Sequence, residues 1–287
     1  MRVYSPTQTE TWLTCPILRA LTYGEDRWSP RRVGRPKLAA ILGIAFGAGV
    51  AVYNQHRSSP GQRAAAIDAA HQVAMAELGA LDAAGHETAE WERETRAKLP
   101  QRASRAVTAY MGADPFPHSW TTLGVEREYG EERARIDWLV DDGEGPLVVD
   151  YKTKLTLYVK GSETKAQALA RTGEEYRHSW QQLHYCWRAE ASRYLIVLAI
   201  LEPRFTLHPI LFEVHPEEQA MWNASAARVW AQMEAEDLGE ALPWQAAEHA
   251  TKYGPCPMQD ACFAYRFHPT LMEQTYVRTP HRERRPA

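Results

Sequence analysis

Alternating apolar and polar positions in the middle of the chain predict a cluster of β-strands. Short runs rich in β-branched and aromatic residues, bounded by turn-forming residues, indicate strands near 121–128, 133–140 and 147–154. A continuous apolar run at 193–201 indicates a buried strand, and 205–214 is expected to be the strand after it. Together these segments predict a mixed sheet.

Helical patterns surround these strands. The segment Ser5-Pro-Thr-Gln is typical of a capped helix start, and helical composition dominates from 38 to 110. Further helices are expected at 174–190 and 216–236. This order of elements favours an α/β (α+β) architecture, in which a mixed sheet is flanked by helices and an N-terminal helical lobe stands beside it.

We expect a single domain over 1–287. Its predicted parts are a mainly helical lobe at 1–118, a core of sheet and helices at 119–240, and a closing segment with cysteines and a basic tail at 241–287. The apolar stretch at 38–53 is too short to span a membrane comfortably. Its three glycines indicate close packing, so a buried helix is favoured over a membrane segment.

Composition and net charge indicate an ordinary globular protein without an overall positive charge. Hydrophobic residues make up 45% and charged residues 24% of the 287, as in ordinary globular proteins. The net charge of −3 gives no overall basic signal for nucleic acid, so a DNA-binding surface must come from local clusters. One such cluster is Lys152, Lys154, Lys160 and Lys165. No secretory signal is visible, which favours a cytoplasmic protein without membrane association.

The strongest chemical signal lies in a predicted hairpin, where two strands flank a turn-rich segment at 141–146. Pairing Val140 with Leu147 places Asp137 directly opposite Asp150. Opposed carboxylates destabilise a sheet, so a chain that places them there is expected to hold a cation between them. A hard divalent cation with oxygen ligands fits that position.

Lys152 follows Asp150 by two positions, so strand alternation places both on one face and Tyr151 on the other. A lysine beside a metal site can orient or activate a water. We therefore predict that Asp137, Asp150 and Lys152 form a metal-dependent phosphodiester-cleaving site. The competing interpretation is solvated strand charge, and the apolar run leading into Asp150 favours the catalytic one.

Two further sets of polar residues are candidates. Gln181 and Tyr185 are four positions apart and so share one helix face. An amide and a phenol can serve phosphate oxygens, although both could merely border the core. Glu126 and Glu128 lie on the strand before Asp137. One of them could be an accessory ligand, and a solvated strand face is at least as consistent.

The hairpin resembles the PD-(D/E)XK nuclease superfamily, in its RecB-like exonuclease branch. That branch has a Gly-x-Ile-Asp strand and then a strand ending in Asp-Tyr-Lys-Thr; here the two strands read Ala134-Arg-Ile-Asp137 and Asp150-Tyr-Lys-Thr. The other shared motifs, in the same order along the chain, are the segment 5–16, Gln181-x-x-x-Tyr185 and Cys256-Pro-x-x-x-x-Cys262. Within the branch, the chain is similar to phage and CRISPR-associated nucleases that carry an iron–sulfur cluster.

The resemblance implies a restriction-endonuclease-like fold and a bound divalent metal, Mg²⁺ or Mn²⁺. Its ligands would be Asp137, Asp150 and the backbone carbonyl of Tyr151. Lys152 would position or activate the attacking water. Gln181 and Tyr185 would lie beside the metal site and support DNA binding or the water network.

One feature departs from the resemblance near the start of the chain. The family's metal-binding histidine commonly ends a Gly-x-Ala-Phe-His run, but here Gly43-Ile-Ala-Phe is followed by Gly47. His56 and His71 are the nearest substitutes, and each is more typical of an ordinary helix histidine. The loss threatens one metal position and makes reduced activity a serious alternative.

The four cysteines are a second departure, and they are not expected to form structural disulfides. The resemblance implies one N-terminal and three C-terminal ligands to a cluster, and Cys15, Cys256 and Cys262 match three of these positions. Because such clusters normally use four thiolates, three alternatives stay open: reduced packed cysteines, a cluster with an unusual ligand such as His249, or zinc. Cys186 is expected to be a small buried hydrophobe.

The leading expectation is a divalent-metal-dependent DNA nuclease, a phosphodiester hydrolase that acts as an exonuclease on ends or single strands. Phage recombination, DNA repair or processing, in a bacterial cell or a phage-infected host, is the expected setting, with a recombination or repair protein as a candidate partner. The alternative is a catalytically impaired DNA-binding member of the same fold. The missing histidine and cysteine favour that alternative, and the intact Asp150-Tyr-Lys152 opposes it.

Overall fold

The computed structural model describes residues 3–23, 28–30, 32–33, 35–55, 61–88, 90–130, 134–177, 179–201, 204–237, 250–251, 254–255, 272–273 and 276–278. The chain divides into two compact units, each built from separate stretches of sequence. One combines Met1–Leu38, Ala76–Ala97 and Ala227–Ala287, and the other combines Ala39–Met75 and Lys98–Ala226. The expectation of a single domain over the whole chain stays a prediction.

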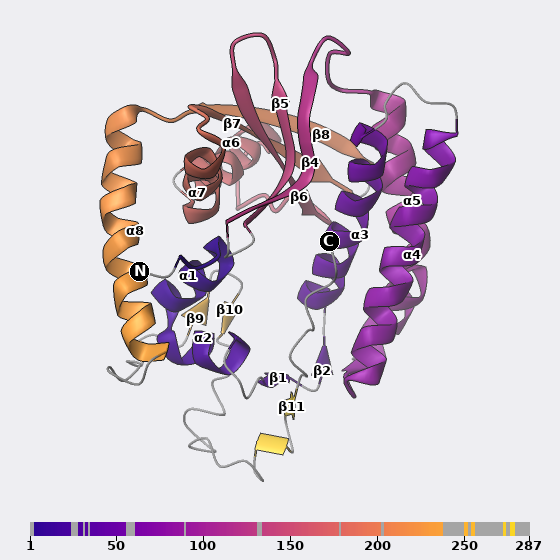
Figure 1. The fold of residues 1–287 in the computed structure, drawn as a ribbon. Helices are drawn as coiled ribbons and strands as arrows, with labels where there is room; N and C mark the ends of the chain where they lie inside the picture. Colours follow the sequence, from indigo (N-terminus) through magenta and orange to yellow (C-terminus); the bar gives the residue numbers. More distant parts are fainter. Residues whose placement is uncertain are drawn as a thin grey trace. The chain divides into compact units, whose positions relative to one another are not determined.

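The second unit holds one mixed sheet of five strands, which confirms the predicted fold class (Figure 1). In spatial order the strands are β4 (Thr121–Tyr129), β5 (Ala134–Asp141), β6 (Pro146–Lys154), β7 (Arg193–Ile200) and β8 (Thr206–Glu213). Neighbours run antiparallel except β6 and β7, which are parallel. β6 and β7 occupy the centre and are buried on both faces, and this burial accounts for their continuous apolar runs.

Helices cover both faces of the sheet (Figure 1). They are α3 (Arg35–Gln55), α4 (Gln62–Ala83) and α5 (Arg93–Ala113) on one side, and α6 (Lys165–Arg177) and α7 (Trp180–Ala189) on the other. The Tyr151 hydroxyl points to the first side, where it is 2.9 Å from Asn54 Nδ2 on α3 and 2.9 Å from the Tyr110 hydroxyl on α5. Asp150 and Lys152 therefore point to the α7 side, as strand alternation predicts.

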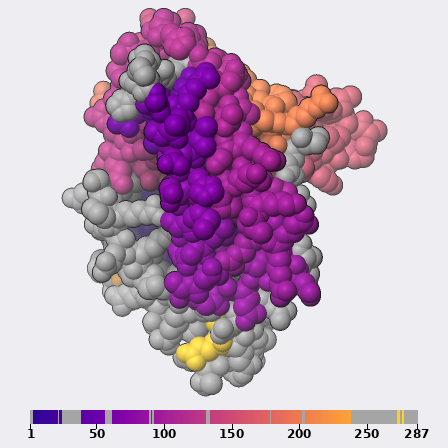
Figure 2. Space-filling view, turned by 90° about the vertical axis from the view of Figure 1, so that its right-hand side faces the viewer, coloured from indigo at the N-terminus to yellow at the C-terminus, as the bar shows by residue number. Residues whose placement is uncertain are grey.

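The apolar stretch forms α3, and two of its glycines, Gly43 and Gly49, allow a very close approach. A side-chain carbon added to Gly49 would lie 2.5 Å from Val107 Cγ2 and 2.8 Å from the Ala66 carbonyl oxygen. The same addition at Gly47 would meet nothing within 4 Å, so close packing is absent there. Among the described helices, only Leu38–Gln55 is long and apolar enough to cross a membrane. Half of it is buried within the protein, and its outer side is visible in Figure 2.

The first unit joins the start of the chain to the end of α8 (Pro216–Asp237). α1 (Pro6–Thr14) begins as predicted, because the Ser5 hydroxyl accepts the Gln8 N–H. Trp12 Nε1 donates to Glu236 on α8 at 2.7 Å. The remaining elements of this unit are α2 (Pro16–Tyr23), β1 (Trp28–Pro30), β2 (Arg32–Val33), β3 (Glu87–Thr88), the 3₁₀ turn Glu90–Glu92, β9 (Ala250–Thr251), β10 (Gly254–Pro255) and β11 (Tyr276–Arg278).

The helix predicted at 174–190 is two helices. α6 begins much earlier, at Lys165, because Thr164 and Gln167 form a reciprocal cap. The Thr164 hydroxyl accepts the backbone N–H of Gln167, and the side-chain oxygen Oε1 of Gln167 accepts the backbone N–H of Thr164. α7 has its own cap at Ser179. The prediction was wrong because the start of α6 is polar and gives little apolar periodicity.

Candidate active site

The β5–β6 hairpin has the register predicted from the sequence. Val140 pairs with Leu147, and the regular pairing ends one step before Asp137 and Asp150. At that step the Asp137 carboxylate accepts the Tyr151 N–H at 2.9 Å. The backbone pairing of β5 and β6 thus ends at Asp137 and Asp150, and the Asp137 carboxylate replaces a backbone carbonyl as the acceptor for the Tyr151 N–H.

Asp150 is almost completely buried in the candidate site. It is 1% exposed, and its Oδ2 lies 2.7 Å from Lys152 Nζ. Gln182, fully buried on α7, donates Nε2 to the same oxygen at 3.4 Å. Sequence reasoning missed Gln182. The available signal was a second amide on a helix face otherwise occupied by Leu183 and Cys186, because an amide buried among apolar residues needs a polar partner.

Lys152 connects the carboxylates to α7. Its Nζ donates to Gln181 Oε1 at 2.7 Å, and Gln181 Nε2 donates to the Tyr185 hydroxyl at 2.9 Å. The Gln-x-x-x-Tyr pair therefore adjoins Asp150 and Lys152. The contacts to Asp150 and Gln181 engage two of the three N–H bonds of the ammonium, and the third remains for a water or a phosphate oxygen.

Glu126 extends the row of carboxylates onto β4. The pairs on either side of it set Glu126 opposite Asp137. Its φ of 49° is uncommon for a residue other than glycine. Glu126 is partly buried, whereas Glu128, two positions further on, is exposed. Glu126 Oε2 lies 2.7 Å from Nε of Arg135 on β5.

These contacts perturb the ionisation of the site. Burial, followed by the charges of Asp150 and Glu126, raises the pKa of Asp137 from 3.8 to about 8. Burial acts to lower the pKa of Lys152, but Asp150 and Asp137 together raise it above its ordinary value. Lys152 is therefore an ammonium that donates hydrogen bonds. Burial also raises the pKa of Tyr185, which stays a neutral phenol.

The donor set suits a hard divalent cation. The candidate side-chain ligands are Asp137 and Asp150; within the described residues no group of three or more histidine, cysteine or acidic side chains could hold a metal ion. The N–H and C=O of one strand residue face the same neighbour. The carbonyl of Tyr151 therefore faces the same side as the N–H that bonds Asp137. Such oxygens, with waters completing the shell, fit Mg²⁺ or Mn²⁺.

Of the histidine and cysteine residues considered, His71, Cys15 and Cys186 lie in the described part of the chain. His71 is exposed on α4. Cys15 is buried with a free thiol, as is Cys186, where burial raises the thiol pKa to about 12. The other candidates lie outside the described residues: His56, His249, Cys256 and Cys262. The proximity of Cys15 to the C-terminal cysteines, and the cluster or zinc that they would hold, stay predictions.

Comparison with known proteins establishes the class of this chain. The family model of the PD-(D/E)XK nuclease superfamily matches residues 3–263, so the chain belongs to that superfamily. No curated protein matches it. Among solved structures, the crystal structure of SSO0001 aligns with 90% of this chain and 95% of its own, at 14% sequence identity and a TM-score of 0.28.

Membership confirms the superfamily expected from the hairpin. Proteins of this superfamily are nucleases that hydrolyse phosphodiester bonds, and they typically use Mg²⁺ or Mn²⁺. DNA is the substrate that such a fold implies. The RecB-like branch, the exonuclease activity and the iron–sulfur cluster stay predictions.

Proposed function

We propose that this chain is a divalent-metal-dependent DNA exonuclease that acts on ends or single strands. The observation that carries the proposal is the Lys152 ammonium held between Asp150 and Gln181, with Asp137 on the opposing strand. Superfamily membership supports phosphodiester hydrolysis, and the RecB-like order of motifs supports action at ends. That resemblance also favours a role in recombination, repair or processing in a bacterial or phage-infected cytoplasm.

The contacts of each residue suggest its role. Asp137, Asp150 and the Tyr151 carbonyl would hold Mg²⁺ or Mn²⁺, which supplies positive charge beside the scissile phosphate and the leaving oxygen. The Lys152 ammonium donates its third N–H to the attacking water or to a phosphate oxygen, and so orients the water toward phosphorus. In the metal-free protein the charges of Asp150 and Asp137 raise the pKa of Lys152, which favours the donor form of its amine.

The helix α7 supports this arrangement. Gln181 Oε1 accepts from Lys152 and so restricts the direction of the ammonium. Gln181 is in turn oriented by the Tyr185 hydroxyl, whose neutral phenol adds a hydrogen-bonding group without adding charge. We assign both residues to positioning Lys152, and the bond rearrangement itself involves the water, the phosphorus and the leaving oxygen.

The test is cleavage of end-labelled linear DNA, single-stranded and duplex, beside covalently closed circles of the same sequence. With Mg²⁺ or Mn²⁺ the linear forms should be shortened from their ends, closed circles should persist, and EDTA should stop the reaction. Nicking of closed circles would show endonuclease action and would overturn the exonuclease assignment.

A second candidate is a catalytically impaired DNA-binding protein of the same fold. Gly47 stands where the family commonly has a metal-binding histidine, and an added side chain would meet nothing within 4 Å there. The position could accept a side chain, but the family's histidine is missing from it. DNA binding without cleavage under either metal would establish this alternative.

A further inference from the structure

The loop that leaves β6 presents an exposed aromatic ring. Tyr158 is 70% exposed, the highest value for a large hydrophobic side chain in the described part of the chain, and Val159 beside it is 40% exposed. Leu157 before them is partly buried. Single exposed apolar residues are common on proteins, so the significance of Tyr158 depends on how its backbone is held and where it lies.

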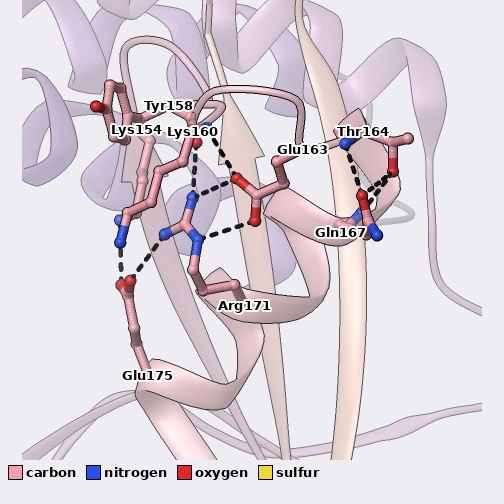
Figure 3. A network of polar contacts seen from close by, with 8 residues as sticks. All are labelled: Lys154, Tyr158, Lys160, Glu163, Thr164, Gln167, Arg171 and Glu175. Carbon is pink, nitrogen blue, oxygen red and sulfur yellow. Dashed lines mark hydrogen bonds and ion pairs between the residues drawn. The ribbon is translucent and has the colours of Figure 1, made fainter.

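Arg171 on α6 fixes the backbone of this loop (Figure 3). Its Nη2 donates to the Tyr158 carbonyl oxygen at 2.8 Å, and its guanidinium pairs with Glu163 at 3.1 Å and Glu175 at 3.3 Å. Glu163 also accepts the Lys160 N–H at 2.9 Å. The Tyr158 ring lies outside this network in Figure 3. The loop backbone is therefore ordered before any ligand binds, while the ring stays accessible.

The loop continues from the candidate site. It begins after Lys154, which shares the face of Lys152 and lies 3.6 Å from Glu175 on α6. Tyr158 is six residues beyond Lys152, so it lies within about 20 Å of it along an extended chain. From Lys154 to Arg171 the chain has four basic residues and one acidic residue. A ring on an ordered, positively charged loop therefore lies within reach of the proposed catalytic lysine.

We propose that Tyr158 stacks on an unpaired base of the DNA substrate while Lys160 contacts a neighbouring phosphate. The proposal rests on the proposed function for its substrate class. Stacking on an accessible ring tolerates any base, and a basic surface follows the backbone, which is how single strands are bound without sequence preference. A protein partner would favour a larger apolar patch, but here only Tyr158 and Val159 are exposed.

Binding of fluorescently labelled single-stranded DNA, measured by anisotropy in EDTA to prevent cleavage, tests the proposal. Tyr158→Ala should weaken binding by about 5- to 100-fold, and Tyr158→Phe should bind like wild type because it keeps the ring. Met221→Ala is the matched control, since Met221 is 67% exposed on α8. Blunt duplex should bind equally to wild type and Tyr158→Ala. Binding of Tyr158→Ala within twofold of wild type, or equal weakening for single strand and duplex, would overturn stacking.

An abasic scan makes the test specific. At one position of the single strand, removing the base should weaken the affinity of wild type. The same removal should not weaken the affinity of Tyr158→Ala any further, because that variant has already lost the stacking ring. The absence of such a position would overturn stacking on a base. Cleavage assays separate the two proposals. If wild type cleaves DNA but Tyr158→Ala binds single strands as tightly as wild type, the role of the loop is rejected and the exonuclease proposal stands. If wild type does not cleave DNA but its binding depends on the Tyr158 ring, the exonuclease proposal is rejected and the role of the loop stands.

Discussion

Replacing Asp150 with asparagine should change how the stability of the metal-free protein depends on pH. In the fold, burial first and the Asp150 charge second raise the pKa of Asp137 from 3.8 to about 8. Between these two values the unfolded chain releases the Asp137 proton and the folded chain keeps it. The free energy of unfolding therefore falls as pH rises through this interval.

The size of the effect follows from one retained proton. The slope is about 1.4 kcal/mol per pH unit, so wild type should lose about 2.7 kcal/mol between pH 5 and pH 7 through Asp137. This stabilisation is complete below the unfolded pKa and lost as pH rises through the folded pKa. In Asp150→Asn one source of repulsion is gone and the folded pKa of Asp137 falls. The loss over the same interval should shrink, while burial retains part of it.

Urea unfolding at pH 5, 6 and 7 in EDTA measures these slopes. Asp142→Asn is the matched control, because Asp142 lies on the same hairpin and the hydrogen bond from Arg193 lowers its pKa. It titrates below the tested interval, so its removal should lower stability without changing the slope. Equal slopes for wild type and Asp150→Asn would refute the repulsion between the opposed carboxylates.

Other perturbations have distinct expected outcomes. Lys152→Met should destabilise the metal-free protein by about 3–5 kcal/mol in urea unfolding, because Asp150 is left buried without its cation; an unchanged midpoint would contradict the buried pair. Gln181→Leu should lower kcat by about 10- to 100-fold with little change in KM, whereas a loss confined to KM would assign it to substrate binding. Gly49→Ala should lower the free energy of unfolding by about 1–3 kcal/mol through overpacking. Gly47→Ala should raise the free energy of unfolding by up to about 1 kcal/mol, because alanine favours the helix more than glycine does. A higher melting temperature for Gly49→Ala than for Gly47→Ala would contradict the packing described for α3.

The hairpin could be predicted because its information is local. A six-residue turn segment and two apolar runs determine one register, Val140 with Leu147, and strand alternation then assigns Asp150 and Lys152 to one face and Tyr151 to the other. The sheet was predictable for the same reason, since each strand is a short apolar segment bounded by turn residues.

Other parts of the site depend on information that no local pattern carries. Glu126 has a left-handed backbone conformation on a strand that also shifts register between Thr122 and Gly124, and no sequence pattern signals either feature. The contact between Gln182 and Asp150 joins residues that are far apart in sequence. The ordering of the Tyr158 loop needs α6 to place Arg171 beneath it, and the start of α6 was itself missed.

The most direct test of the central claim compares wild type, Asp150→Ala and Asp142→Ala on end-labelled single-stranded DNA with Mg²⁺ or Mn²⁺. The two substitutions remove carboxylates from the same hairpin, one inside the candidate site and one outside it. We predict that wild type and Asp142→Ala cleave, and that Asp150→Ala binds DNA but leaves it intact. Cleavage by Asp150→Ala at the wild-type rate would contradict the assignment of this site.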